Sequence, residues 1–162
     1  TFMKKLFLIL ILGLVLCMTG CKSNNKKVPL EELYGKYEFE ECEFINPLSG
    51  QKKEQINAKY EDVARFTIKE TVFSFYDSNS TTPAISLKSI NYKEEDINTG
   101  INNSDVKKLL KNASTRYDIY RVADSQGYSI IFSGDDIYFV EFRFLSSREH
   151  VVWQVFEIEK RD

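Results

Sequence analysis

Apolar and polar residues alternate in a series of short runs from residue 35 onward in this 162-residue chain. Tyr37 and Phe39 alternate with glutamates, and Tyr138, Val140 and Phe142 share one side of a later run. A period of two, rich in aromatic and β-branched residues, is typical of half-buried β-strands. The pattern predicts about eight strands, at residues 35–44, 64–69, 71–77, 84–93, 114–122, 127–133, 136–145 and 150–159.

Short polar connections, such as residues 46–50, 77–83 and 133–136, separate the expected strands. Short connections favour antiparallel pairing between strands that are neighbours in sequence. The chain therefore predicts a mainly β fold, which is either an antiparallel up-and-down barrel or a strongly bent sheet. Closure into a barrel would remove the exposed edges that invite aggregation.

One short helix is expected to interrupt the strands. Ser104 is its expected N-cap, and Val106, Leu109 and Leu110 form an apolar stripe at helical spacing. A single helical turn is also expected at residues 30–34, after Pro29.

The first 20 residues follow a different pattern. Lys4 and Lys5 precede an apolar run at residues 6–20, whose 15 residues fall short of a membrane span. A basic start, a short apolar run and small residues before a cleavage point are features of a signal peptide. We expect a signal-peptide helix that is removed from the mature protein. The alternative is a short anchor helix flanked by basic residues from Lys22 onward.

The end of this segment, Met18-Thr19-Gly20-Cys21, resembles the lipobox of bacterial lipoprotein signal peptides. Met18 stands where leucine is commoner, whereas Thr19, Gly20 and Cys21 match. Cys17 is a weaker candidate because bulky Leu16 precedes it. The resemblance implies cleavage between Gly20 and Cys21 and a diacylglyceryl group, with palmitate-type acyl chains, on the Cys21 thiol.

Two acyl chains make a stable membrane anchor, because each buried carbon contributes about 0.8 kcal/mol. The resemblance therefore implies a lipoprotein of the bacterial cell envelope. Its expected place is the extracytoplasmic side of the cell membrane or the outer membrane, with the lipid on Cys21 as its link to that membrane.

Three parts follow along the chain: a signal peptide at 1–20, a lipidated tether at 21–28 and one β-rich domain at 29–162. The whole chain has 22 Lys and Arg against 24 Asp and Glu, and loss of Lys4 and Lys5 leaves 20 against 24. A mildly acidic domain argues against nucleic acid as a partner. Cys42 is then the one thiol left in the domain, so no internal disulfide is expected.

No constellation of residues points to catalysis, a metal or a cofactor. His150 is the only histidine, too few for the usual His/Cys metal site. Phosphate-binding glycine motifs and a nucleophile elbow are absent from the sequence. Acidic clusters at 38–43, 94–96 and 135–136 are interpreted as solvent-facing positions. Carboxylate-based hydrolysis of sugars is the least favoured alternative.

The segment Leu33-Tyr34-Gly35-Lys36-Tyr37 resembles the start of lipocalin-like domains, in which a helical turn leads into Gly-x-Trp on the first strand. Gly35 matches and Tyr37 replaces the tryptophan. The resemblance implies an eight-stranded barrel that binds a small apolar molecule. It also implies a basic residue of the last strand over the ring, for which Lys160 and Arg161 are candidates.

After the signal segment the chain holds ten Phe, nine Tyr and one Trp, which either fill a barrel or line a pocket. Two hypotheses follow. The first is a non-enzymatic module that binds a small hydrophobic ligand inside the barrel. The second is an envelope accessory protein whose barrel is filled and whose surface docks a protein partner.

Overall fold

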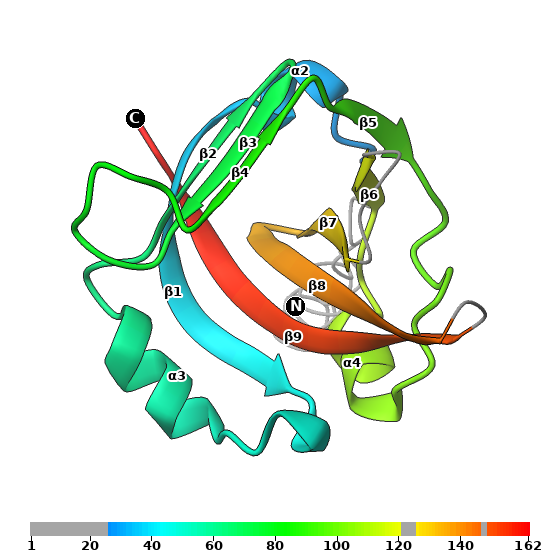
Figure 1. Cartoon of the computed structure of the whole chain (residues 1–162). Helices are drawn as coiled ribbons and strands as arrows, with labels where there is room; N and C mark the ends of the chain where they lie inside the picture. The colour runs from blue at the N-terminus through cyan, green and yellow to red at the C-terminus, as the bar shows by residue number, and fades with distance from the viewer. Residues whose placement is uncertain (1–25, 121–125, 147–148) are drawn as a thin grey trace, which may run out of the picture.

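A single antiparallel sheet of nine strands curls into a half-barrel (Figure 1). The computed structural model describes residues 26–120, 126–146 and 149–162. The order of strands across the sheet is β4-β3-β2-β1-β9-β8-β7-β6-β5. Their bounds are β1 Gly35–Ile45, β2 Arg65–Lys69, β3 Val72–Tyr76, β4 Ile85–Lys88, β5 Asn91–Glu94, β6 Thr115–Tyr120, β7 Gln126–Ser133, β8 Asp136–Ser146 and β9 Glu149–Arg161.

The mainly β fold and the antiparallel order agree with the sequence prediction, but the strand expected at 84–93 is divided. Ser89 has a φ of 55°, in the left-handed region, and ends β4 just before β5 begins. This break makes nine strands of the expected eight. Within the described residues, β4 pairs with β3 and β5 pairs with β6, so the sheet is open between β4 and β5.

Chain continuity bridges this open edge. Successive antiparallel pairings from β4 around to β5 leave these two strands running in the same direction. Beyond Ser89, the Ile90 amide donates to the Thr71 carbonyl at 3.2 Å. The Tyr92 hydroxyl donates to the Lys69 carbonyl at 2.8 Å. The start of β5 is therefore tied to the β2–β3 turn before it joins β6.

The described residues contain three α-helices, where the sequence predicted one helix and one helical turn. They are α2 Leu30–Leu33, α3 Lys53–Tyr60 and α4 Ser104–Leu109, together with the 3-10 turn η1 Pro47–Ser49. The predicted turn is α2 and the predicted helix is α4. The N-cap of α4 is Asn103 rather than Ser104, since the Asn103 side chain accepts from the amides of Asp105 and Val106.

Helix α3 was not predicted because its sequence is polar and carries a weak apolar pattern. Only Ile56 and Tyr60, four residues apart, are buried. The helix lies along β1 (Figure 1), and its Asn57 side chain accepts from the Cys42 amide at 2.7 Å. Tyr60 packs edge-on against Phe39, with ring centres 5.8 Å apart. Helix α3 thus supports the half of β1 that β2 does not cover.

Two β-bulges on β1 keep its glutamates out of the core. Register shifts against β9 leave Glu40 and Glu43 as extra residues. Unbroken alternation from Phe39 would turn Glu41 inward, whereas the bulges leave it exposed and bury Cys42 instead. The acidic run is thereby carried on the outer face.

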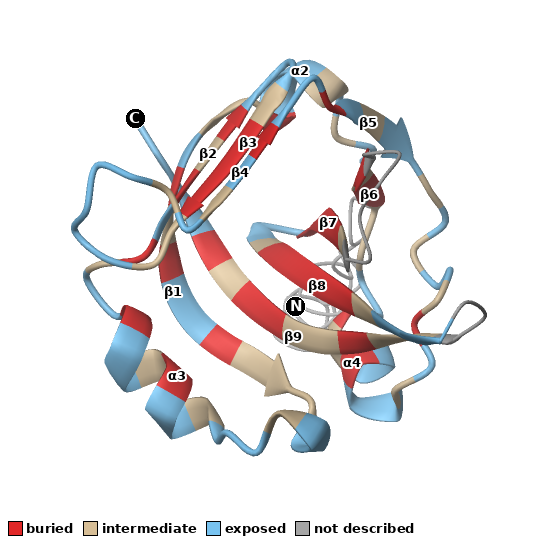
Figure 2. Cartoon of the chain, in the orientation of Figure 1, coloured by how far each residue is buried: buried red, intermediate tan, exposed pale blue. Residues whose placement is uncertain are grey.

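The sheet is buried on two sides where β7, β8 and β9 meet (Figure 2). The inner face packs in the core that also holds Tyr37, Phe66 and Phe156. The outer face, with Val140 and Phe142, packs under α4 and the segment that precedes it.

We predict that substitution of Ser89 and Ser86 by valine has opposite effects on stability. A β-branched residue is strained at positive φ, so Ser89→Val should lower the free energy of unfolding by about 1–2 kcal/mol. Ser86 lies exposed within β4, where valine suits the extended backbone, so Ser86→Val should be neutral or mildly stabilising. Urea unfolding of both variants measures the difference. Equal losses at the two sites would contradict the break described at Ser89.

Candidate functional site

The predicted lipidation site lies outside the described residues. Met18, Thr19, Gly20 and Cys21 all precede residue 26, and so does the expected signal-peptide helix. Cleavage between Gly20 and Cys21 and lipid on Cys21 therefore stay predictions.

The chain enters the described fold along the β5–β6 edge, through a segment that we call the strap, residues 27–34. Lys27 pairs with Glu94 at 2.6 Å. The Val28 amide donates to Thr115 Oγ1 at 2.8 Å, and the Tyr117 hydroxyl donates to the Val28 carbonyl at 2.7 Å. Lys27 and Val28, which the sequence assigned to the tether, are thus bound to the sheet.

The other half of the strap is held by β1 and β9. Lys160 Nζ donates to the Glu32 carbonyl at 2.6 Å and lies 6.0 Å from the ring centre of Tyr37. The Tyr37 hydroxyl donates to the carbonyl of Leu33, which is fully buried. Gly35 leaves room for this lysine, because a Cβ there would lie 2.7 Å from Lys160 Cε.

Of the two basic residues proposed for the position over the Tyr37 ring, Lys160 therefore occupies it. Arg161 points elsewhere and pairs with Glu38 at 2.6 Å. Membership in the lipocalin-like family stays a prediction.

Aromatic rings from opposite walls meet inside the half-barrel. Phe139 of β8 lies 5.0 Å from Phe66 and 5.7 Å from Phe73, measured between ring centres. It also lies 5.6 Å from Tyr128 and 6.1 Å from Phe156. All five side chains are at most 4% exposed. This part of the interior is filled by the protein itself.

Beyond Phe139 the inner face of β8 becomes polar. Glu141 and Arg143 follow on the same face, because side chains alternate along a strand. Glu141 is 4% exposed, and its two carboxylate oxygens accept from Arg143 Nε at 2.8 Å and from Gln154 Nε2 at 2.6 Å. Trp153 is the extra residue where the register of β9 shifts, and its ring centre lies 4.0 Å from the Arg143 guanidinium carbon.

We call Glu141, Arg143, Trp153 and Gln154 the mouth cluster. The Arg143 side chain is 41% exposed, and within the described residues its two Nη groups donate no hydrogen bond. A guanidinium fixed by a carboxylate and an indole presents a planar fork to the solvent. That fork matches the oxygens of a carboxylate or phosphate, and Trp153 offers an apolar surface beside it.

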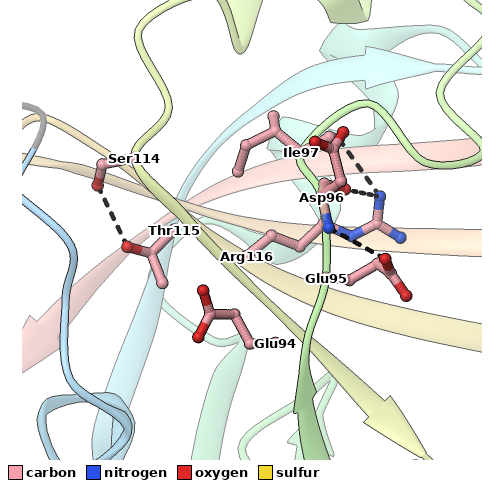
Figure 3. A pocket seen from close by; sticks show the side chains of 7 residues that line it. All are labelled: Glu94, Glu95, Asp96, Ile97, Ser114, Thr115 and Arg116. Atoms are coloured by element: carbon pink, nitrogen blue, oxygen red, sulfur yellow. Dashed lines mark hydrogen bonds between the residues drawn. The ribbon is translucent and has the colours of Figure 1, made fainter.

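Arg116 provides a contrast, because nearly all of its donors are already used. It is 3% exposed; its Nη1 donates to the carbonyls of Asp96, Ile97 and Thr99, and its Nε and Nη2 donate to Asp118. Arg116 lines a surface depression of about 500 Å³ (Figure 3). The remaining lining residues are Glu94, Glu95, Asp96, Ile97, Ser114 and Thr115. Arg116 fastens the chain after β5 to β6 and, being buried, has only one Nη2 N–H without a partner within the described residues.

Three of the predicted acidic positions, Glu40, Asp135 and Asp136, lie together with two further glutamates on the outer face of β1 and β9. With Glu157, Glu159 and Lys160 they line a depression of about 430 Å³. A hydrogen bond with Glu159 raises the pKa of Glu40. Burial raises the pKa of Glu157, and the charges of Asp136 and nearby glutamates raise it further. Mutual repulsion across this face opposes folding at neutral pH.

The mouth cluster was not found from the sequence. Alternation drew attention to Tyr138, Val140 and Phe142, but this face of β8 is covered by the outer core. The sequence did carry one indication of the site: Glu141 and Arg143 follow Phe139 at intervals of two residues and so share its face of the strand. A charged pair inside an apolar run indicates either a strand edge or a buried polar contact, and the period alone does not separate the two.

No set of three or more His, Cys, Asp and Glu side chains in the described ranges could hold a metal ion. In those same ranges no helix has the length and apolar character needed to cross a membrane. The chain matches no protein-family model, no curated protein and no solved structure.

We predict that Glu157→Gln stabilises the protein at neutral pH. The pKa of Glu157 is raised on folding, so its ionised form costs stability above that pKa and the cost disappears as pH falls through it. The gain should be about 0.5 kcal/mol at pH 7, because solvent screens the side chain, and should vanish near pH 4. Thermal unfolding against pH measures it. The matched control Glu70→Gln removes the same charge from the exposed β2–β3 turn. An equal gain from both substitutions, or a gain for Glu157→Gln that grows toward acid pH, would refute the assignment.

Cys42 is expected to be inert in the native state. The residue is fully buried, and burial raises the pKa of its thiol to about 11. Burial is the largest cause of this rise in pKa, and the charges of Glu43 and Glu41 add to it. In a chain with Cys17 and Cys21 replaced by serine, iodoacetamide at pH 8 should label Cys42 only after denaturation. A Ser78→Cys variant, exposed in the β3–β4 loop, should react at once. Rapid labelling of native Cys42 would show the burial to be wrong.

Proposed function

We propose that this chain is a non-enzymatic binding protein, anchored by lipid on Cys21 to the extracytoplasmic face of a bacterial membrane. Its ligand binds at the mouth cluster. The observation that carries the ligand site is the Arg143 guanidinium, which Glu141 and Trp153 hold in place while its Nη groups stay unpaired within the described residues.

The position of the aromatic rings limits the kind of ligand. Because the rings around Phe139 fill the interior, a long apolar molecule has no room between the walls at that level. The accessible inner surface combines the Arg143 fork with the Trp153 ring. We therefore propose a small amphiphile, with a carboxylate or phosphate for Arg143 and a short apolar body for Trp153.

Glu141 limits the electrostatic attraction between Arg143 and an acidic ligand. Its charge balances that of Arg143, so the pair recognises an acidic group through directed hydrogen bonds more than through net charge. A ligand without carboxylate or phosphate oxygens would leave the Nη groups of Arg143 without hydrogen-bond acceptors. Selectivity for the head group is therefore expected to exceed selectivity for the apolar body.

Docking of a protein partner is the second candidate function. It is supported by the filled interior and by exposed apolar residues near the β8–β9 turn, where Phe144 is 48% and Leu145 is 51% exposed. In this case the surface rather than the inner face would carry the activity.

We predict that Arg143→Gln weakens binding of octanoate and octyl phosphate about tenfold or more. One charge-assisted hydrogen bond contributes roughly 1.5–3 kcal/mol, which corresponds to at least this factor. Octanol, which lacks the acidic group, should bind weakly and equally to both proteins. Calorimetric titration of the full chain measures all three probes.

Arg65→Gln is the matched control, because Arg65 also lies over an aromatic ring, 5.1 Å from that of Tyr76, but at an exposed position. It should leave binding unchanged. Absence of binding by either acidic probe, or equal loss in the two arginine variants, would exclude the mouth cluster as the site and favour the docking function.

A further inference from the structure

The strap fixes where the anchored end of the chain leaves the domain. Lys27 and Val28 are bound by Glu94 at the end of β5 and by Thr115 and Tyr117 at the start of β6. These contacts continue into the core through Leu33, which is fully buried. The exit point therefore belongs to the fold.

The strand register gives the separation between this exit point and the mouth cluster. Thr115 pairs with Phe132, and Phe132 pairs with Ile137 near the start of β8. Arg143 lies six residues after Ile137 along β8. Glu94 and Tyr117, which also bind the strap, are level with Ile130 and Phe139, four residues before Arg143. At about 3.3 Å per residue, about 13–20 Å of strand separates the level of the strap contacts from Arg143.

The chain between Cys21 and Lys27 is short. Six residues span at most about 22 Å, whatever conformation they take. With Cys21 at the bilayer, the exit point stays within about 22 Å of the lipid surface, whereas Arg143 is linked to the lipid only through the folded domain. A compact tether draws the exit point to the surface, and the mouth cluster follows only if the domain tips onto its side.

We propose that the strap holds the β5–β6 edge toward the bilayer and turns the mouth cluster away from it. The ligand therefore enters from the extracytoplasmic space, as a water-soluble molecule with an acidic group, and not by lateral transfer from the membrane. This orientation rests on the proposed lipid anchor at Cys21.

The test uses the full, lipidated protein in vesicles of phosphatidylcholine and phosphatidylglycerol that carry a head-group energy acceptor. One fluorophore is placed at Glu31→Cys in α2, within the strap, or at Leu145→Cys, two residues beyond Arg143; both positions are exposed. Buried Cys42 does not compete for the label. Energy transfer to the bilayer should be several-fold higher from position 31 than from position 145.

A variant with 20 Gly/Ser residues inserted after Lys22 is the matched control, and it should remove most of the difference between the two positions. Equal transfer from both positions in the parent protein, or higher transfer from position 145, would overturn the orientation while the anchor stands. Failure of the protein to float with the vesicles, or flotation of a Cys21→Ser variant to the same extent, would overturn the anchor and the orientation with it.

Discussion

Contact between aromatic rings on opposite walls, centred on Phe139, is the interaction on which the curl of the sheet depends. Hydrogen bonds do not join β4 to β5, so backbone pairing alone would leave the sheet free to flatten. Phe139 meets Phe66 and Phe73 across the interior, and burial of these rings stabilises the curved form. The same contact decides where a ligand has room. The interior is apolar and occupied at the level of Phe139; it becomes polar at the buried Glu141, and solvent reaches it at Arg143.

The two arginines that approach the sheet show how similar residues take different roles. Arg116 is surrounded by carbonyls and a carboxylate, so it acts as a fixed internal cation that joins a connecting segment to β6. Arg143 has one carboxylate contact and one aromatic contact, and its remaining donors face outward from that pair. Burial alone would select Arg116 as the functional residue. The count of satisfied donors selects Arg143 instead, because recognition requires hydrogen-bonding capacity that the fold has not already used.

Strand positions followed closely from the sequence, because aromatic and β-branched residues alternate with charges at nearly every strand. The break at Ser89 did not, since a serine in an alternating run has no local feature that announces positive φ. Helix α3 was missed because its stability comes from two inward residues, Ile56 and Tyr60, and from contacts with β1 rather than from its own pattern. The candidate site was missed for a different reason. Both faces of β8 are buried, so the period of two predicts a strand there without saying that Phe139, Glu141 and Arg143 face the interior.

The division of one expected strand at Ser89 also affects how the side of the half-barrel formed by β4 and β5 could change during evolution. Because β4 and β5 are joined by covalent chain and not by a ladder, the seam between them can widen with every strand pair intact, once the hydrogen bonds of Ile90 and Tyr92 to the β2–β3 turn are lost. The volume free for a ligand inside the half-barrel is then set by the size of the side chains around position 139 and not by backbone pairing. An evolved variant with leucine or alanine at position 139 would contain an internal cavity while keeping the same nine strands. It could then bind larger ligands without a change of fold.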